Sequence, residues 1–225
     1  MTYMLVIQTA LDEGFVCLAA NGSVIGEKKC LERKDQAAFL HPAIQSLLEE
    51  AHLKPGRLDA IAVVSGPGSY TGLRIGMACA KGLCFALSIP LVTLNTLDWM
   101  AAAAPPDGKS GSCPMIDARR MEVFTARYDA HGLRMEDPRA LILSPDAFAE
   151  ALRQHPIRFF GSGAEKWKAL CPHPNAWFPD IRPKATTASQ MAWSHWQQSA
   201  FADLAYAAPF YGKEFHSTLK PHPLP

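Results

Sequence analysis

The stretch Ser65–Gly76 carries the residue types best suited to binding a small anion. It holds three glycines and a proline within seven residues, and it lies between an apolar β-branched run, 61–64, and a long apolar segment, 73–87. This order predicts a strand, a glycine-rich turn and the start of a helix. Backbone N–H groups at a helix N-terminus, together with nearby hydroxyl groups, are able to hold a phosphate.

Two interpretations of this turn are open. In the first, Gly68, Ser69 and Thr71 contact the phosphate of a bound ligand. In the second, the glycines form a tight strand-to-helix connection, and a serine or threonine caps the helix. The glycine content alone favours the second interpretation, because such turns are common in proteins that bind no ligand there.

Other patterns that would indicate a self-contained reaction centre are missing. The eight histidines never form H-x-x-x-H or H-E-x-x-H, and the six cysteines never form C-x-x-C, so we predict no metal site. The glycine turn lacks the Gly-Lys-Ser/Thr of a P-loop, and no serine lies in G-x-S-x-G. These absences count against a P-loop nucleotidase and against a serine hydrolase.

Several blocks resemble the TsaB family. They are the glycine turn with the segment after it (65–83 and 89–92), the block 116–124, the opening 4–10 and the turn 161–163. The resemblance implies an α/β fold of the actin-like ATPase (ribonuclease-H-like) class, with two lobes that each hold a mixed sheet flanked by helices. It also implies a non-catalytic subunit that pairs with TsaD to support threonylcarbamoyl transfer to adenosine in tRNA.

The resemblance also bears on cofactors and partners. TsaD carries its metal on a histidine pair in its first helix, whereas the matching stretch here, 34–40, has no histidine. Gln8 stands where the actin-like pattern has an aspartate near Mg²⁺, although Thr9 keeps a hydroxyl group. Thr9 and Gly163 complete the predicted phosphate contacts. We therefore expect ATP or ADP to bind only weakly or at a partner interface.

The expected partners are a TsaD-like protein, a TsaE-like ATPase, tRNA indirectly, and a second copy when the chain is alone.

Two predicted helices, 35–51 and 73–87, are the candidate partner surface. The second has only Arg74 and Lys81 as charged residues, and a helix that is apolar nearly all round must be buried nearly all round. Either the first helix or another polypeptide covers it, and the family resemblance favours another polypeptide. The predicted interface residues are Phe39, Ala43, Leu47, Gly76, Ala78, Ala80, Lys81 and Leu83.

A polar group on a predicted hairpin, Asp117, Arg119 and Glu122, is the candidate lining of the cleft between lobes, together with Arg74. The alternative is a turn with surface ion pairs, each of which contributes little to stability. For Arg74 the alternatives are an anchor for the glycine turn or for a carboxylate of a partner.

Composition limits the remaining functions. With 48% hydrophobic and 19% charged residues the chain is globular, and its net charge of +1 disfavours binding nucleic acid unaided. Without a basic leader or a membrane-length apolar run, the expected location is the cytoplasm. Alternative functions are a stand-alone actin-like ATPase or kinase relative, a glycoprotease-like hydrolase, and a homodimeric binding protein unconnected with tRNA.

The linker-like run 105–112 predicts a boundary between an N-terminal lobe, 1–106, and a C-terminal lobe with a tail, 107–225. Predicted strands are 3–9, 15–20, 24–31, 61–64, 91–94, 113–117, 121–128, 140–143 and 157–160. Further helices are expected from 95 or 96 to 104, from 145 to 154, from 164 to 170, and from 187 or 189 onward. Residues 208–213 resemble the family's final strand, and 220–225 are expected to fray.

Overall fold

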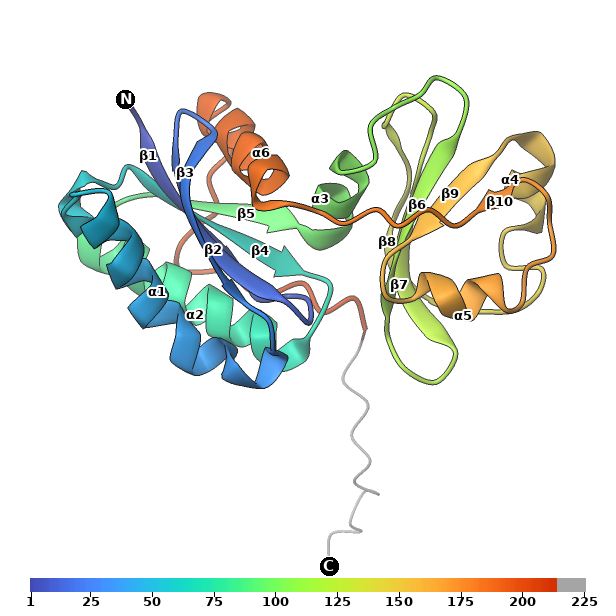
Figure 1. The fold of residues 1–225 in the computed structure, drawn as a ribbon, viewed down its shortest axis with the longest axis horizontal. Helices are drawn as coiled ribbons and strands as arrows, with labels where there is room; N and C mark the ends of the chain where they lie inside the picture. Colours follow the sequence, from blue (N-terminus) through green and yellow to red (C-terminus); the bar gives the residue numbers. More distant parts are fainter. Residues whose placement is uncertain (214–225) are drawn as a thin grey trace, which may run out of the picture.

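The computed structural model describes residues 1–213, and the prediction for 220–225 lies outside them. Two five-stranded sheets lie side by side, each with helices packed on it (Figure 1). The division of the chain near residue 107 stays a prediction. The structure adds that the last helix, α6 (Ala185–Gln197), packs on the first sheet, although it follows the second sheet in sequence.

The first sheet has the strand order β3-β2-β1-β4-β5. Strand β1 pairs antiparallel with β2 and parallel with β4, and β4 pairs parallel with β5. The β2–β3 hairpin turns at Asn21-Gly22, where both residues have positive φ, as the sequence predicts. The strands are β1 (Tyr3–Gln8), β2 (Gly14–Ala20), β3 (Ser23–Cys30), β4 (Ala60–Gly66) and β5 (Leu91–Asn95).

Helices cover both faces of the first sheet, which is why its central strands are continuously apolar. Alternate residues of β1 separate into two core clusters, with Leu5 and Ile7 on the face of α1 (Gln36–Glu50) and α2 (Tyr70–Leu87). Met4 and Val6 lie on the opposite face, which α6 and α3 (Thr96–Ala102) cover. Short 3-10 turns at Arg33–Asp35 and Pro55–Arg57 lie on either side of α1.

The second sheet repeats the topology of the first. Its order is β10-β9-β6-β7-β8, with β6–β7–β8 antiparallel and β6, β9 and β10 parallel. The same strand order therefore occurs twice along one chain. Its elements are β6 (Gly111–Asp117), β7 (Glu122–Tyr128), β8 (Arg134–Ile142), α4 (Ala149–Gln154), β9 (Ile157–Phe160), α5 (Ala164–Lys168) and β10 (Ala176–Trp177).

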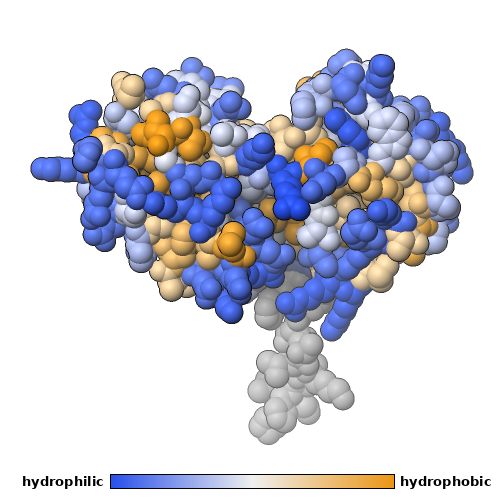
Figure 2. Space-filling view, in the orientation of Figure 1, coloured by the Kyte–Doolittle hydropathy of each residue, from blue (hydrophilic) through white to orange (hydrophobic). Residues whose placement is uncertain are grey.

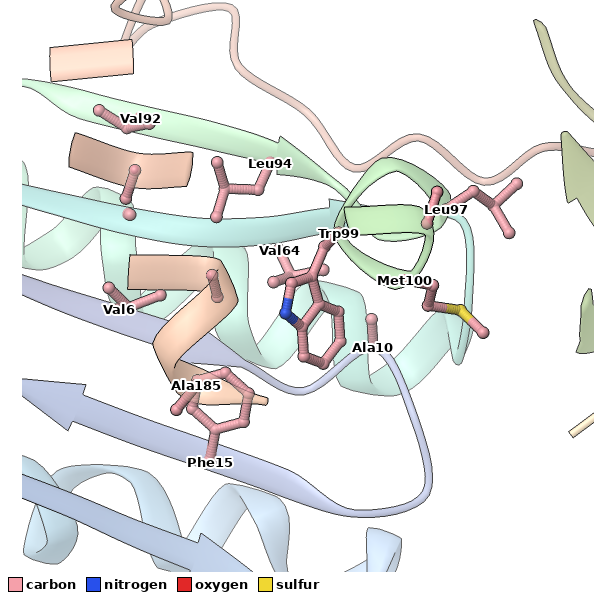
Figure 3. Packing of buried hydrophobic residues seen from close by; sticks show 14 of the residues in the cluster. Val6, Ala10, Phe15, Val64, Val92, Leu94, Leu97, Trp99, Met100 and Ala185 are labelled. Carbon is pink, nitrogen blue, oxygen red and sulfur yellow. The ribbon is translucent and has the colours of Figure 1, made fainter. Parts of the chain in front are cut away.

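One hydrophobic cluster joins the two sheets. Figure 3 shows Trp99 of α3 at its centre, with Phe15 on one side and Val64 on the other. The rings of Trp99 and Phe15 meet edge to face at 5.7 Å, and the indole N–H donates to the carbonyl of Lys184 at 3.0 Å. Phe124 and Phe160 of the second sheet belong to the same cluster, so the two lobes share a core.

Several predicted boundaries were wrong. Helix α2 begins at Tyr70, three residues before the predicted start at residue 73, because Ser69 caps it. Strand β8 starts at 134 instead of 140, α6 starts at 185, and α4 starts at 149 instead of 145 because a turn precedes it. The segment 208–213 forms no strand. Its backbone makes one hydrogen bond to β4, from Phe210 N–H to the Ser65 carbonyl, which is too little to extend the sheet.

Candidate functional site

The glycine turn connects β4 to α2 as the sequence predicts. The Ser69 hydroxyl accepts a hydrogen bond from the N–H of Gly72 at 3.3 Å, so serine is the N-cap of the helix. The Ser69 N–H donates to the Ala10 carbonyl at 2.7 Å. The Ala10 carbonyl, in the chain after β1, therefore already accepts from one of the N–H groups that the phosphate interpretation would use to bind the phosphate.

The glycines of this turn admit the backbone that follows β1. A Cβ atom on Gly72 would lie 2.0 Å from the Thr9 carbonyl oxygen, and one on Gly68 would lie 2.3 Å from the Ala10 carbonyl oxygen. A Cβ atom on Gly76 would lie 2.4 Å from the Thr9 hydroxyl oxygen. Close packing of α2 on β1 thus accounts for these glycines without a ligand.

The other predicted phosphate contacts are also engaged within the chain. The buried hydroxyl of Thr9 donates to the Gly72 carbonyl at 2.7 Å, and the Gly163 N–H donates to the Met115 carbonyl at 3.0 Å. Thr71 is exposed. Of the two interpretations of the turn, these contacts favour the capped strand-to-helix connection. The prediction of weak ATP or ADP binding stays untested.

Gln8 belongs to a hydrogen-bonded turn at the end of β1. Its side-chain N–H donates to the Glu13 carbonyl at 2.9 Å, and its side-chain oxygen accepts from the Leu11 N–H at 3.1 Å. Gln36 of α1, also buried, donates to the Leu11 carbonyl at 3.0 Å. An aspartate at position 8 could not donate to Glu13, so the amide has a structural role that a carboxylate would not fill.

The hairpin group is partly an ion-pair network. Asp117 accepts hydrogen bonds from the Lys166 ammonium at 2.5 Å and from the Arg119 N–H at 2.7 Å. Partial burial acts to raise the pKa of Asp117, but the hydrogen bonds from Lys166 and Arg119 prevail, and the pKa lies below its ordinary value. The side chain of Arg119 is exposed, and its backbone has φ +66. Asp117 therefore has a stabilising partner, in line with the ion-pair alternative.

Glu122 and Arg74 have different partners. The Glu122 carboxylate pairs with Lys213, and Arg74 Nε donates to the Tyr211 hydroxyl at 3.1 Å. The Arg74 guanidinium also lies 4.2 Å from the ring centre of Tyr70. The four predicted cleft residues thus do not converge on one point. Residues 211–213 lie between Arg74 and the hairpin, and no sequence pattern indicates where this segment lies.

The structure corrects half of the predicted partner surface. Ala43, Leu47, Gly76 and Ala80 are buried against their own sheet, so they present no surface to a partner. Lys81 donates to the carbonyls of Ala205 and Ala207. The remaining predicted residues lie toward solvent: Ala78 is exposed, and Phe39 and Leu83 are half-buried.

The exposed sides of α1 and α2 form an apolar groove of about 410 Å³. Small residues on α2, Ala78 and Gly82, keep its floor low. Figure 2 shows apolar atoms among hydrophilic ones over the region in which Figure 1 draws the two helices. The lining residues are Ala37, Leu40, His41, Ile75, Ala78, Cys79, Gly82 and Leu83.

Phe85 is a surface residue that the predicted interface omits. It is 81% exposed, seven residues after Ala78 and three after Gly82, hence on the same side of α2. A helical projection aligned on Ala78 would have found it. An aromatic ring this exposed beside an apolar groove marks a candidate protein-binding surface.

Two absences concern residues 1–213, the part of the chain that the structure describes. Within that range no group of three or more His, Cys, Asp or Glu side chains is placed to hold a metal ion. Within the same range, no helix is long and apolar enough to cross a membrane.

Comparison with known proteins gives consistent matches. The profile of TsaD, described as tRNA N6-adenosine threonylcarbamoyltransferase, matches residues 33–170. The chain is 33% identical over 160 residues to the tRNA threonylcarbamoyladenosine biosynthesis protein TsaB of Bacillus subtilis, covering 69% of each. It is 30% identical over 172 residues to the TsaB protein of Escherichia coli, covering 74% of each.

Solved structures agree. A Pseudomonas aeruginosa protein described as similar to peptidase YeaZ matches with a TM-score of 0.81 and 25% identity, covering 95% of this chain and all of that one. YeaZ from the same organism matches with a TM-score of 0.76 and 26% identity, over 94% of this chain and all of that one. Together with the duplicated strand order, these matches confirm the predicted two-lobed, actin-like fold.

Proposed function

Because this chain belongs to the TsaB family, we propose that it takes part in the synthesis of threonylcarbamoyladenosine in tRNA as a non-catalytic subunit that pairs with a TsaD-like protein. The relatives' names support the pathway. We further propose that the pairing takes place on the exposed sides of α1 and α2.

The observation that carries the pairing is the apolar groove with Phe85 beside it. Fully burying a phenylalanine side chain is worth about 1.5–3 kcal/mol, and Phe85 leaves most of that free energy unused in the isolated chain. The small side chains of Ala78 and Gly82 let a helix of another protein approach closely. A partner that fills the groove would bury the exposed apolar side of α2.

The same surface is proposed to pair two copies of the chain when the partner is absent. Because both complexes would use α2, the partner should convert the homodimer into a heterodimer. Size-exclusion chromatography with light scattering, on the chain alone and after addition of the TsaD-like protein, checks this exchange. A heterotetramer that keeps the homodimer contact would contradict the shared surface.

The pairing is tested by placing a charge in the groove. Ala78→Glu puts a carboxylate where the partner would seat, and an unpaired charge in a dry interface costs several kcal/mol. We expect calorimetric titration with the TsaD-like protein of the same organism to show at least about a hundredfold loss of affinity. Ala169→Glu, at an exposed alanine after α5, is the matched control and should bind normally. Equal affinity of both variants would refute the location.

The pathway is tested separately. Cells depleted of this protein should lose threonylcarbamoyladenosine from their tRNA, measured by mass spectrometry of tRNA nucleosides. Re-expression of the Ala169→Glu variant should restore the modification, whereas re-expression of Ala78→Glu should not. Normal levels of the modified nucleoside in depleted cells would refute the function, whichever surface binds the partner.

A further inference from the structure

Residues 202–213 form a segment that we name the strap. It follows α6, has no regular secondary structure, and first contacts the edge of the first sheet, where the Ala202 N–H donates to the Leu91 carbonyl at 2.8 Å. Lys81 of α2 then holds it by donating to the carbonyls of Ala205 and Ala207 at 3.2 and 2.9 Å. The beginning of the strap is therefore fixed to the first lobe.

The middle of the strap lies beside the glycine turn. Phe210 N–H donates to the Ser65 carbonyl at 2.8 Å, and the ring of Tyr211 packs on that of Tyr70 at 4.7 Å. The Tyr211 hydroxyl accepts from Arg74. These contacts place the strap against both the end of β4 and the first turns of α2.

At Gly212 the strap passes between the lobes. A Cβ atom there would lie 2.9 Å from the ring of Phe124, in β7, and 3.2 Å from Pro67, in the glycine turn. The residue also has φ +68, which favours glycine. A side chain at this position would therefore have to displace the Phe124 ring or the strap itself.

The end of the strap is fixed to the second lobe. The Lys213 ammonium pairs with the Glu122 carboxylate, donates to the Ala118 carbonyl at 3.2 Å, and lies 5.7 Å from the centre of the Phe124 ring. Both charged side chains are about three-quarters buried, at 27% and 22% exposure, so solvent screens this pair less than an exposed one.

We propose that the strap sets the angle between the two lobes. A second attachment is α3, which packs on β6 and β7, whose Asp98 accepts from the Tyr128 hydroxyl at 2.6 Å, and whose Trp99 lies in the core cluster that the two lobes share. In Figure 1, α3 and the end of the strap lie at opposite sides of the region between the lobes. One attachment leaves a hinge, whereas two separated attachments prevent rotation about either. Release of the strap would free the second lobe to rotate about α3.

The inter-lobe distance distribution tests the proposal. Spin labels are placed on Lys34→Cys and Arg153→Cys, both at exposed positions in different lobes, in a Cys171→Ser background because the other cysteines are buried. Dilution with unlabelled protein removes distances between copies. A chain ending at Ala208 lacks the inter-lobe part of the strap, and a chain ending at Ser217 retains it as the control.

We expect the chain ending at Ala208 to give a distance distribution at least about twice as wide as that of the control. Lys213→Glu in the full chain should widen it similarly, and the reversed pair Glu122→Lys/Lys213→Glu should narrow it again. Far-UV circular dichroism identifies any variant that fails to fold. If the shortened chain does not fold, the widths measured for the two point variants decide whether the strap sets the angle. An unchanged width on removal of the strap, or on Lys213→Glu, would show that α3 and the shared core set the angle without the strap and would overturn the proposal.

Discussion

Replacing Gly72 by alanine should destabilise this protein, although alanine is the better helix former. Gly72 lies in the first turn of α2 and packs directly on the end of β1. The added Cβ atom would lie 2.0 Å from the Thr9 carbonyl oxygen and 3.0 Å from the side-chain oxygen of Gln36. The first of these atoms is backbone at the end of a central strand, so it has little freedom to move.

Two opposing effects set the magnitude. Alanine gains up to about 1 kcal/mol over glycine inside a helix. Overpacking a well-packed site costs about 1–3 kcal/mol, and a clash with strand backbone belongs at the upper end of that range. The net loss is therefore about 2 kcal/mol. At roughly 2–4 °C per kcal/mol for a chain of this size, Tm should fall by about 4–8 °C.

Gly82→Ala is the matched control. It makes the same change in the same helix, but nothing lies within 4 Å of the added Cβ atom, so only the gain in helix propensity remains. We expect Tm to rise by about 1–4 °C for a gain of up to about 1 kcal/mol. Thermal unfolding followed by far-UV circular dichroism measures both variants. A Gly72→Ala protein as stable as Gly82→Ala would refute the argument that β1 makes glycine necessary.

Two further predictions concern the same region and the hairpin. Thr9→Val removes a buried hydroxyl and leaves the Gly72 carbonyl without its 2.7 Å donor. Urea unfolding should show that the free energy of unfolding falls by about 1–3 kcal/mol, whereas Thr9→Ser should be close to the native chain. The lowered pKa of Asp117 means that its stabilisation is fully present above the unfolded carboxyl's pKa of about 3.9 and is lost as the pH falls through the lower folded value. The Tm difference between the native chain and Asp117→Asn should therefore be present near neutral pH and vanish in acid; a difference independent of pH would contradict the ion pair with Lys166.

Much of this fold follows from the sequence. Strands β1 and β4 read as unbroken apolar runs because helices cover both faces of their sheet. Asn21-Gly22 specifies a hairpin turn because both residues tolerate positive φ, and Ser69 specifies the start of α2 because its hydroxyl accepts a backbone N–H. These are local relations, and local residue types determine them.

The tertiary structure decided which side of α2 faces outward and which neighbouring atoms pack against its glycines. A helix that is apolar nearly all round shows no preferred buried side, so Gly76 and Ala80 could be assigned to a partner surface while Phe85 was omitted. Contacts such as Arg74 with Tyr211, 137 residues apart, have no periodic signature in the sequence. They exist because one short segment lies between the two lobes, and only the packed chain determines where that segment lies.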